Sequence, residues 1–255
     1  MEFNMAGHSH WAGIKHKKAA IDNKRGKLWS KLSKAIIIAA KIGGGDPATN
    51  IRLRQAIQDA KDVSMPKDNI ARAIKKGTGE LDGGNVEEII YEGYGAHGVA
   101  IMCEIMTDNR NRTAPELRKM FEIHGGNMGA TNCVAWLFER KGLFLLPADS
   151  SDEEAIMETA LEAGADDFLL QGDQYEITCE PETYTAVAEA LAAAEIVVTS
   201  KQVTRIPNNT IDLDVAQAKQ VLKLMEALDD HDDVQNVSAN FNLTDEVVTA
   251  LQNEA

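Results

Sequence analysis

The 255-residue sequence has little of what marks secreted or membrane-bound chains. It contains three cysteines, an odd number placed far apart, so we expect reduced thiols in a cytoplasmic protein and no disulfide framework. The longest apolar run, residues 35–40, is far too short to cross a bilayer. Residues 1–34 carry many lysines and no apolar stretch of signal-peptide length. We therefore expect a cytoplasmic location and no membrane partner.

Motifs of catalysis and metal binding are also missing. There is no Gly-x-Ser-x-Gly and no His-Glu-x-x-His sequence. The histidines near the N-terminus have no cysteine or carboxylate at ligand spacing, which argues against a metal site. The acidic run at residues 229–233 has no glycine at its bend and no terminal glutamate, so a solvated loop is expected there. We predict no enzyme activity, no small-molecule substrate and no cofactor.

Charge, in contrast, is abundant and very unevenly distributed. Residues 1–79 hold 16 Lys and Arg against 6 Asp and Glu, a net charge of +10. Residues 80–255 hold 10 Lys and Arg against 34 Asp and Glu, a net charge of −24. A basic module joined to an acidic body is typical of a protein that binds a polyanion at one end. A solvated basic face without a partner is the alternative.

Helical periodicity dominates the basic region. Apolar residues recur at helical spacing after Leu28, and three glycines, residues 43–45, end that helix. Asp46 and Pro47 are expected to begin the next helix, as its N-cap and first residue. A break at Pro66 precedes a third, short helix that ends at Gly77. The region is predicted to be a small all-helical domain.

Beyond a glycine-rich linker the chain alternates between strand-like and helix-like segments, which gives an α+β fold class. Residues 134–206 read as β-α-β-β-α-β, the ferredoxin-like pattern, with a turn at Lys141–Gly142. The segments on either side complete a second α/β sandwich. The predicted domains are therefore a helical domain followed by two α/β-sandwich domains, the last inserted into the middle one: 1–4 leader or tag, 5–79 helical, 80–133 plus 207–255 discontinuous, 134–206 inserted.

Side chains suited to nucleic acid gather in the helical domain. Basic side chains neutralise phosphates, and Trp11 could stack on an unpaired base or simply anchor its segment on the core. Lysines at steps of three and four along the first helix form a cationic ridge on a rigid rod. Lys75 and Lys76 could equally serve the end of their helix. The predicted nucleic-acid contacts are His8, His10, Trp11, Lys15, His16, Lys17, Lys18, Lys24, Arg25, Lys27, Lys31, Lys34, Arg52, Arg54, Lys67, Arg72, Lys75 and Lys76.

A second basic segment lies in the acidic body. Asn109, Arg110, Asn111 and Arg112 join a strand to a helix and are a candidate secondary contact with RNA or a partner. In the alternative interpretation Asn111 or Thr113 caps the helix.

Several motifs together resemble the YebC family, which includes the mitochondrial translational activator of cytochrome c oxidase subunit I. The resemblance covers nearly the whole chain and is densest in its first half. Asn132 stands where the family has glycine, and asparagine tolerates the left-handed backbone of that turn. The motifs are Ala6-Gly7-His8-Ser9 with Trp11, residues 14–20, 24–27, 44–47, 65–68 and 72–77, Tyr91-Glu92-Gly93-Tyr94-Gly95, and residues 107–113.

The resemblance implies three domains and a non-enzymatic regulator of gene expression. Family members are described as DNA-binding transcriptional regulators, and others as ribosome-associated translation factors that relieve stalling. The residues of this chain do not separate an rRNA target from a DNA target. A scaffold whose basic face binds an acidic protein stays a third possibility, and the sequence assigns no oligomeric state.

Overall fold

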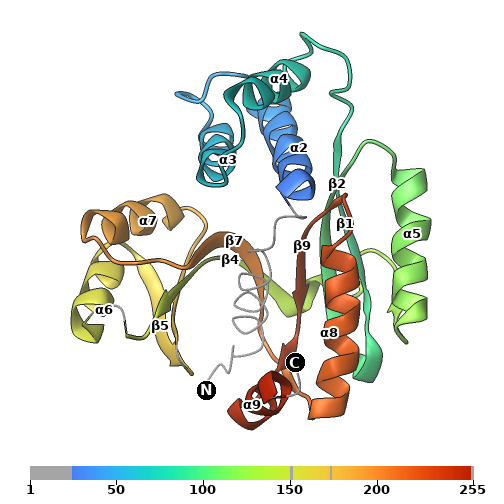
Figure 1. The fold of residues 1–255 in the computed structure, drawn as a ribbon, viewed down its shortest axis with the longest axis vertical. Coiled ribbons are helices and arrows are strands. Elements are labelled where there is room, and N and C mark those ends of the chain that lie inside the picture. Colours follow the sequence, from blue (N-terminus) through green and yellow to red (C-terminus); the bar gives the residue numbers. More distant parts are fainter. Residues whose placement is uncertain (1–24, 150–151, 173, 254–255) are drawn as a thin grey trace.

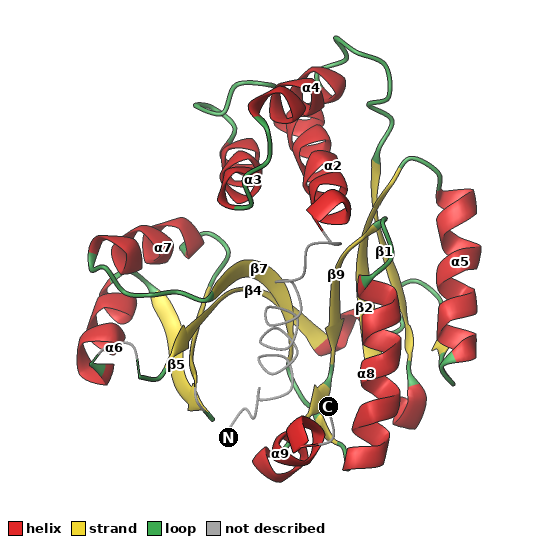
Figure 2. Ribbon diagram, in the orientation of Figure 1, coloured by secondary structure: helices red, strands yellow, loops and turns green. Residues whose placement is uncertain are grey.

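The computed structural model describes residues 25–149, 152–172 and 174–253. These residues form a helical part and two four-stranded sheets, each sheet covered by a pair of helices on one face (Figures 1 and 2). The predicted fold class is confirmed: an α+β protein with an N-terminal helical domain and two α/β sandwiches, the last inserted into the middle one. The exact domain boundaries stay a prediction.

From residue 25 onward, the helical part consists of α2, α3 and α4, which pack together because each has one apolar face. Their buried side chains, among them Ile36, Leu53 and Ile70, share one core. None of the helices in the described residues is long and apolar enough to cross a membrane. The helices are α2 (Arg25–Gly43), α3 (Ile51–Asp62) and α4 (Lys67–Gly77).

The predicted start of α3 at Asp46 is wrong, because Asn50 caps this helix instead. The Asn50 side-chain oxygen accepts from the Leu53 N–H at 3.0 Å. Its amide nitrogen donates to the carbonyls of Ala39 and Gly44, both at 2.8 Å. Asp46 closes a turn by accepting from the Ala48 N–H at 2.9 Å. Buried Asn50 thus joins α2 to α3.

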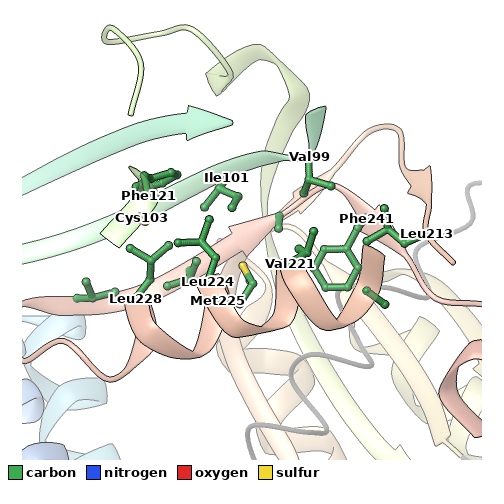
Figure 3. Packing of buried hydrophobic residues seen from close by; sticks show 14 of the residues in the cluster. Val99, Ile101, Cys103, Phe121, Leu213, Val221, Leu224, Met225, Leu228 and Phe241 are labelled. Atoms are coloured by element: carbon green, nitrogen blue, oxygen red, sulfur yellow. The ribbon is translucent and has the colours of Figure 1, made fainter. Parts of the chain in front are cut away.

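The first sheet has the strand order β3-β1-β2-β9, so its last strand comes from the end of the chain. Helices α5 and α8 pack on one face, where Phe121, Leu224 and Met225 meet Ile101 and other strand residues (Figure 3). The elements are β1 (Glu87–Tyr94), β2 (Ala100–Thr107), α5 (Arg110–Ile123), β3 (Asn127–Met128), α8 (Val215–Asp229) and β9 (Val234–Ala239).

The opposite face of β2 contacts every other part of the molecule in turn. Ala100 and Met102 pack against residues 134–138. The Glu104 carboxylate accepts from Arg205 Nε of the inserted domain at 3.1 Å. Met106 joins the core of the helical domain. Strand β2 therefore contacts both the inserted domain and the helical domain.

The second sheet has the order β5-β6-β4-β7, with every neighbouring pair antiparallel, as the ferredoxin-like pattern predicts. The predicted turn at Lys141–Gly142 is wrong, because Gly142 lies inside β4. A Cβ there would meet the Cys179 sulfur at 2.6 Å, so close packing accounts for the glycine. The elements are β4 (Phe138–Pro147), α6 (Glu153–Glu162), β5 (Ala165–Gln171), β6 (Gln174–Cys179), α7 (Tyr184–Ala193) and β7 (Ser200–Pro207).

The chain enters and leaves the second sheet at paired positions. Phe138 of β4 faces Pro207 of β7, and the Asn208 N–H donates to the Leu137 carbonyl at 2.8 Å. Short elements that the sequence pattern did not indicate complete the fold: η2 (Ala96–Gly98), η3 (Ala135–Leu137), β8 (Ile211–Asp212), β10 (Phe241–Asn242) and α9 (Asp245–Asn253).

Candidate nucleic-acid interface

The most N-terminal part of the predicted interface lies outside the described residues. Arg25 is the first residue of α2, and its contact with nucleic acid stays a prediction. The same holds for the predicted contacts before it: His8, His10, Trp11, Lys15, His16, Lys17, Lys18 and Lys24.

The lysines of α2 form a joint with the acidic body, which the sequence did not predict. Lys27 Nζ donates to the Asp230 carbonyl at 3.1 Å, and Lys31 Nζ to the Asp229 carbonyl at 2.6 Å. These carbonyls end α8, where the helix dipole favours a cation. Figure 1 shows the first turns of α2 beside the end of α8. We call Lys27, Lys31 and Lys34 the joint lysines.

Lys34 completes the joint by binding the loop after α8. Its Nζ donates to the Asp232 carbonyl at 3.0 Å and to the Asp233 carboxylate. Asp233 is 2% exposed, so the expectation of a solvated loop at residues 229–233 is wrong for this residue. A buried carboxylate needs partners of opposite charge, and the joint supplies one of them.

Three further groups hold the second oxygen of Asp233. Arg112 donates to it at 2.9 Å, Thr113 at 2.7 Å and Thr107 at 3.1 Å. Burial alone would raise the pKa of Asp233, but the hydrogen bonds from Lys34, Arg112 and Thr113 outweigh it and hold this pKa well below its ordinary value. Asp233 therefore stays charged at neutral pH and links three segments of the chain.

The predicted secondary contact, residues 109–112, turns out to begin helix α5. Asn109 is the N-cap, accepting from the Arg112 N–H at 3.1 Å, so the assignment of the cap to Asn111 or Thr113 is wrong. Arg112 is engaged by Asp108 and Asp233. Arg110 and Asn111 are exposed, and Arg110 has no side-chain partner within the described part of the chain.

A second group of cations in the helical domain faces solvent. Arg54 on α3 and Lys67, Arg72 and Lys75 on α4 are exposed. Their side chains make no hydrogen bond or ion pair to any residue that the structure describes. We call these four residues the outer cations. Lys61, which is not among the predicted contacts, is exposed as well.

The two remaining predicted contacts of the helical domain differ from the outer cations. Arg52 pairs with Glu88 at 2.8 Å, and Lys76 is half-buried. The apolar faces of α3 and α4 pack into the core that they share with α2. The outer cations therefore lie on the opposite, solvent-exposed faces of α3 and α4. An exposed, unpaired cation keeps its full charge for a phosphate. Contact of these residues with nucleic acid stays a prediction.

The described residues show no group of three or more histidine, cysteine or acidic side chains placed to hold a metal ion. The three cysteines are free thiols. Burial raises the pKa of the Cys179 thiol, and burial likewise raises that of the Cys133 thiol. The described part of the site consists of cations on helices.

Comparisons with known proteins agree with this architecture. The family model for the TACO1/YebC protein N-terminal domain matches residues 9–80, and the model for the TACO1/YebC second and third domain matches residues 86–241. The chain therefore belongs to the TACO1/YebC family.

Close relatives cover the chain almost completely. A probable transcriptional regulatory protein of Rhodopirellula baltica is 57% identical over 96% of this chain and 100% of its own length. A probable transcriptional regulatory protein of Geobacter sulfurreducens is 54% identical over 97% of this chain and 100% of its own. The crystal structure of a conserved hypothetical protein from Aquifex aeolicus matches with a TM-score of 0.84 and 48% identity, covering 94% of this chain and 99% of that one.

Proposed function

We propose that this protein is a non-enzymatic, nucleic-acid-binding regulator of gene expression. The observation that carries the proposal is the group of outer cations, which are exposed on a compact helical domain and have no partner among the described residues. The relatives' names support a regulatory role. The acidic body has a net charge of −24, so it would repel phosphates and direct the phosphate backbone of a polyanion to the helical domain.

The contacts of α2 support an interface on a different part of the helical domain from the lysines of that helix. The joint lysines already bind carbonyls and carboxylates of the chain itself, so in this arrangement they are not free to neutralise phosphates. The outer cations on α3 and α4, together with the basic N-terminal segment, are the proposed contact surface. Duplex DNA and ribosomal RNA both present the phosphates that such a surface would bind.

Charge reversal at the outer cations tests the proposal. The variant Arg54→Glu, Arg72→Glu, Lys75→Glu should lose most of its affinity for nucleic acid, and the slope of log affinity against log salt should shrink by about three on duplex DNA. The matched control is Arg118→Glu, Lys119→Glu, Lys223→Glu, which changes the net charge equally with exposed cations of the acidic body. We expect this control to bind almost like the unmodified protein.

Two assays separate the possible targets. Fluorescence anisotropy with labelled duplex DNA and co-sedimentation with ribosomes should each be run on the unmodified protein and both variants. Binding that only the outer-cation variant loses supports the proposal and identifies the target. Equal losses in both variants, or no binding to either target at low salt, would refute it and favour a scaffold for an acidic protein.

A further inference from the structure

An exposed pair of aromatic rings lies beside the first sheet, far along the chain from the basic residues of the helical domain. Trp136 is 70% exposed and Tyr94 is 40% exposed. The Trp136 Nε1–H and the Tyr94 hydroxyl each donate to the carbonyl oxygen of Cys133 at 3.3 Å. One atom therefore holds the polar edges of both rings, and the two aromatic side chains lie next to each other.

The segment that carries Trp136 is fixed by a buried acid. Glu92 of β1 is 3% exposed, and its carboxylate accepts from the backbone N–H groups of Asn132, Val134 and Ala135 at 2.7, 2.8 and 2.8 Å. Burying a carboxylate is costly unless several donors surround it. Three such bonds within four consecutive residues leave the loop little freedom to rearrange.

Packing of the residues on both sides of Trp136 also fixes the position of this segment. Val134 and Leu137 are buried against Ala100 and Met102 of β2, whereas Trp136 between them points to solvent. Glu92 and Tyr94 of β1 face Met102 and Ala100 in the strand register, so they lie on this same sheet face. Asn132 has a φ of +65°, as asparagine at a family glycine position predicts, and this geometry lets the loop turn back over the face.

A rigid, uncharged, exposed indole with its N–H already bonded can recognise a partner mainly through its flat face. Side-chain entropy lost on binding is small, because Glu92 and the Cys133 carbonyl have already ordered the site. Flat aromatic faces bind unpaired nucleobases by stacking, whichever base is presented. A base paired inside a duplex is already stacked on its neighbours and cannot reach the ring.

We infer that Trp136, with Tyr94 beside it, is a stacking platform for an unpaired nucleobase. This inference rests on the proposed function, since the helical domain would hold the phosphates of the same nucleic acid. It assigns to the protein a preference for single-stranded or looped segments. Glu92 acts as a positioning residue that orders the loop without touching the base.

Tryptophan fluorescence gives a direct test. The chain has three tryptophans, so the variant Trp11→Phe, Trp29→Phe leaves Trp136 as the sole tryptophan. A short oligouridylate should quench its fluorescence, because a stacked base quenches an indole, and the same strand annealed to oligoadenylate should not. Unchanged fluorescence at an oligouridylate concentration that saturates binding would overturn the inference.

Affinity supplies the second readout. Replacing Trp136→Ala in the otherwise unmodified chain should weaken oligouridylate binding about 5- to 100-fold, with Trp136→Phe intermediate. The matched control is Ile123→Ala at the end of α5, which truncates another apolar side chain with 66% exposure, and it should bind normally. Both residues are exposed, so both variants should unfold at the temperature of the unmodified protein.

The outcomes distinguish the inference from the function on which it rests. Normal binding by Trp136→Ala, combined with lost binding by the outer-cation variant, would refute the stacking platform and keep the proposed function. Loss of binding in Trp136→Ala and in the outer-cation variant supports both. Failure of the unmodified protein to bind oligouridylate or duplex DNA at low salt would refute both.

Discussion

The joint lysines and the outer cations carry the same charge within one small domain, yet the fold uses them in opposite ways. The joint lysines bind the end of α8 and the loop that follows it. The outer cations point to solvent and have no partner in the described part of the chain. A row of lysines at helical spacing therefore indicates a surface that binds anions, but it does not show whether the anion belongs to the same chain.

The largest difference between the two groups should appear in stability. Asp233→Ala removes the carboxylate that Lys34 and Arg112 share, so we expect the free energy of unfolding to fall by about 3 kcal/mol. Charge reversal of an outer cation should change it by less than about 0.5 kcal/mol per site. Urea denaturation followed by circular dichroism measures both. Losses of equal size would contradict the distinction between the two groups.

Acid should weaken the joint, because the joint depends on the Asp233 carboxylate, whereas the outer cations bind no carboxylate of the described residues. Because the pKa of Asp233 is lowered in the folded chain, its stabilisation is complete above the unfolded-state value, about 3.9, and is lost as pH falls below that value. The stability advantage of the unmodified protein over Asp233→Asn should therefore shrink between about pH 4 and pH 2. Thermal unfolding over this range measures the advantage, and one that stays constant would exclude Asp233 as its source.

The smallest effect should come from an exposed ion pair at the border of the helical domain. Arg52 Nη2 and Glu88 Oε1 lie 2.8 Å apart, but the two side chains are 43% and 45% exposed. Water and salt screen such a pair, so Arg52→Ala should cost no more than about 0.5 kcal/mol. If thermal unfolding shows a cost comparable to that of Asp233→Ala, exposure does not decide which ion pairs stabilise this fold.

Local patterns predicted much of the fold because the residues that decide it are neighbours in sequence. Helical spacing and glycine breaks gave the three N-terminal helices, and element order gave the inserted ferredoxin-like sandwich. Small errors arose where tertiary contacts decide. Asn50 rather than Asp46 caps α3 because its amide also binds Ala39 and Gly44. Gly142 signals close packing against Cys179 rather than a turn.

The sequence could not predict the joint or the aromatic pair. Lys31 and Asp229 are 198 residues apart, and no local signal connects a basic helix to a distant acidic run. The exposure of Trp136 depends on Glu92, which lies on another strand and looks like any other acidic residue in the sequence. The role of such a buried acid lies in its three-dimensional contacts and leaves no mark in the local sequence.

The joint also has a consequence for the order of events during synthesis. Its hydrogen bonds connect residues 198 to 203 positions apart, so the partners of α2 are synthesised long after the helix itself. At about 5–20 residues per second, a nascent chain carries its lysines without their acidic partners for roughly 10–40 seconds. Strand β9, which completes the first sheet, leaves the ribosome at the same late stage. Completion of the first sheet and its contact with the helical domain therefore both require that α8 and β9 have been synthesised.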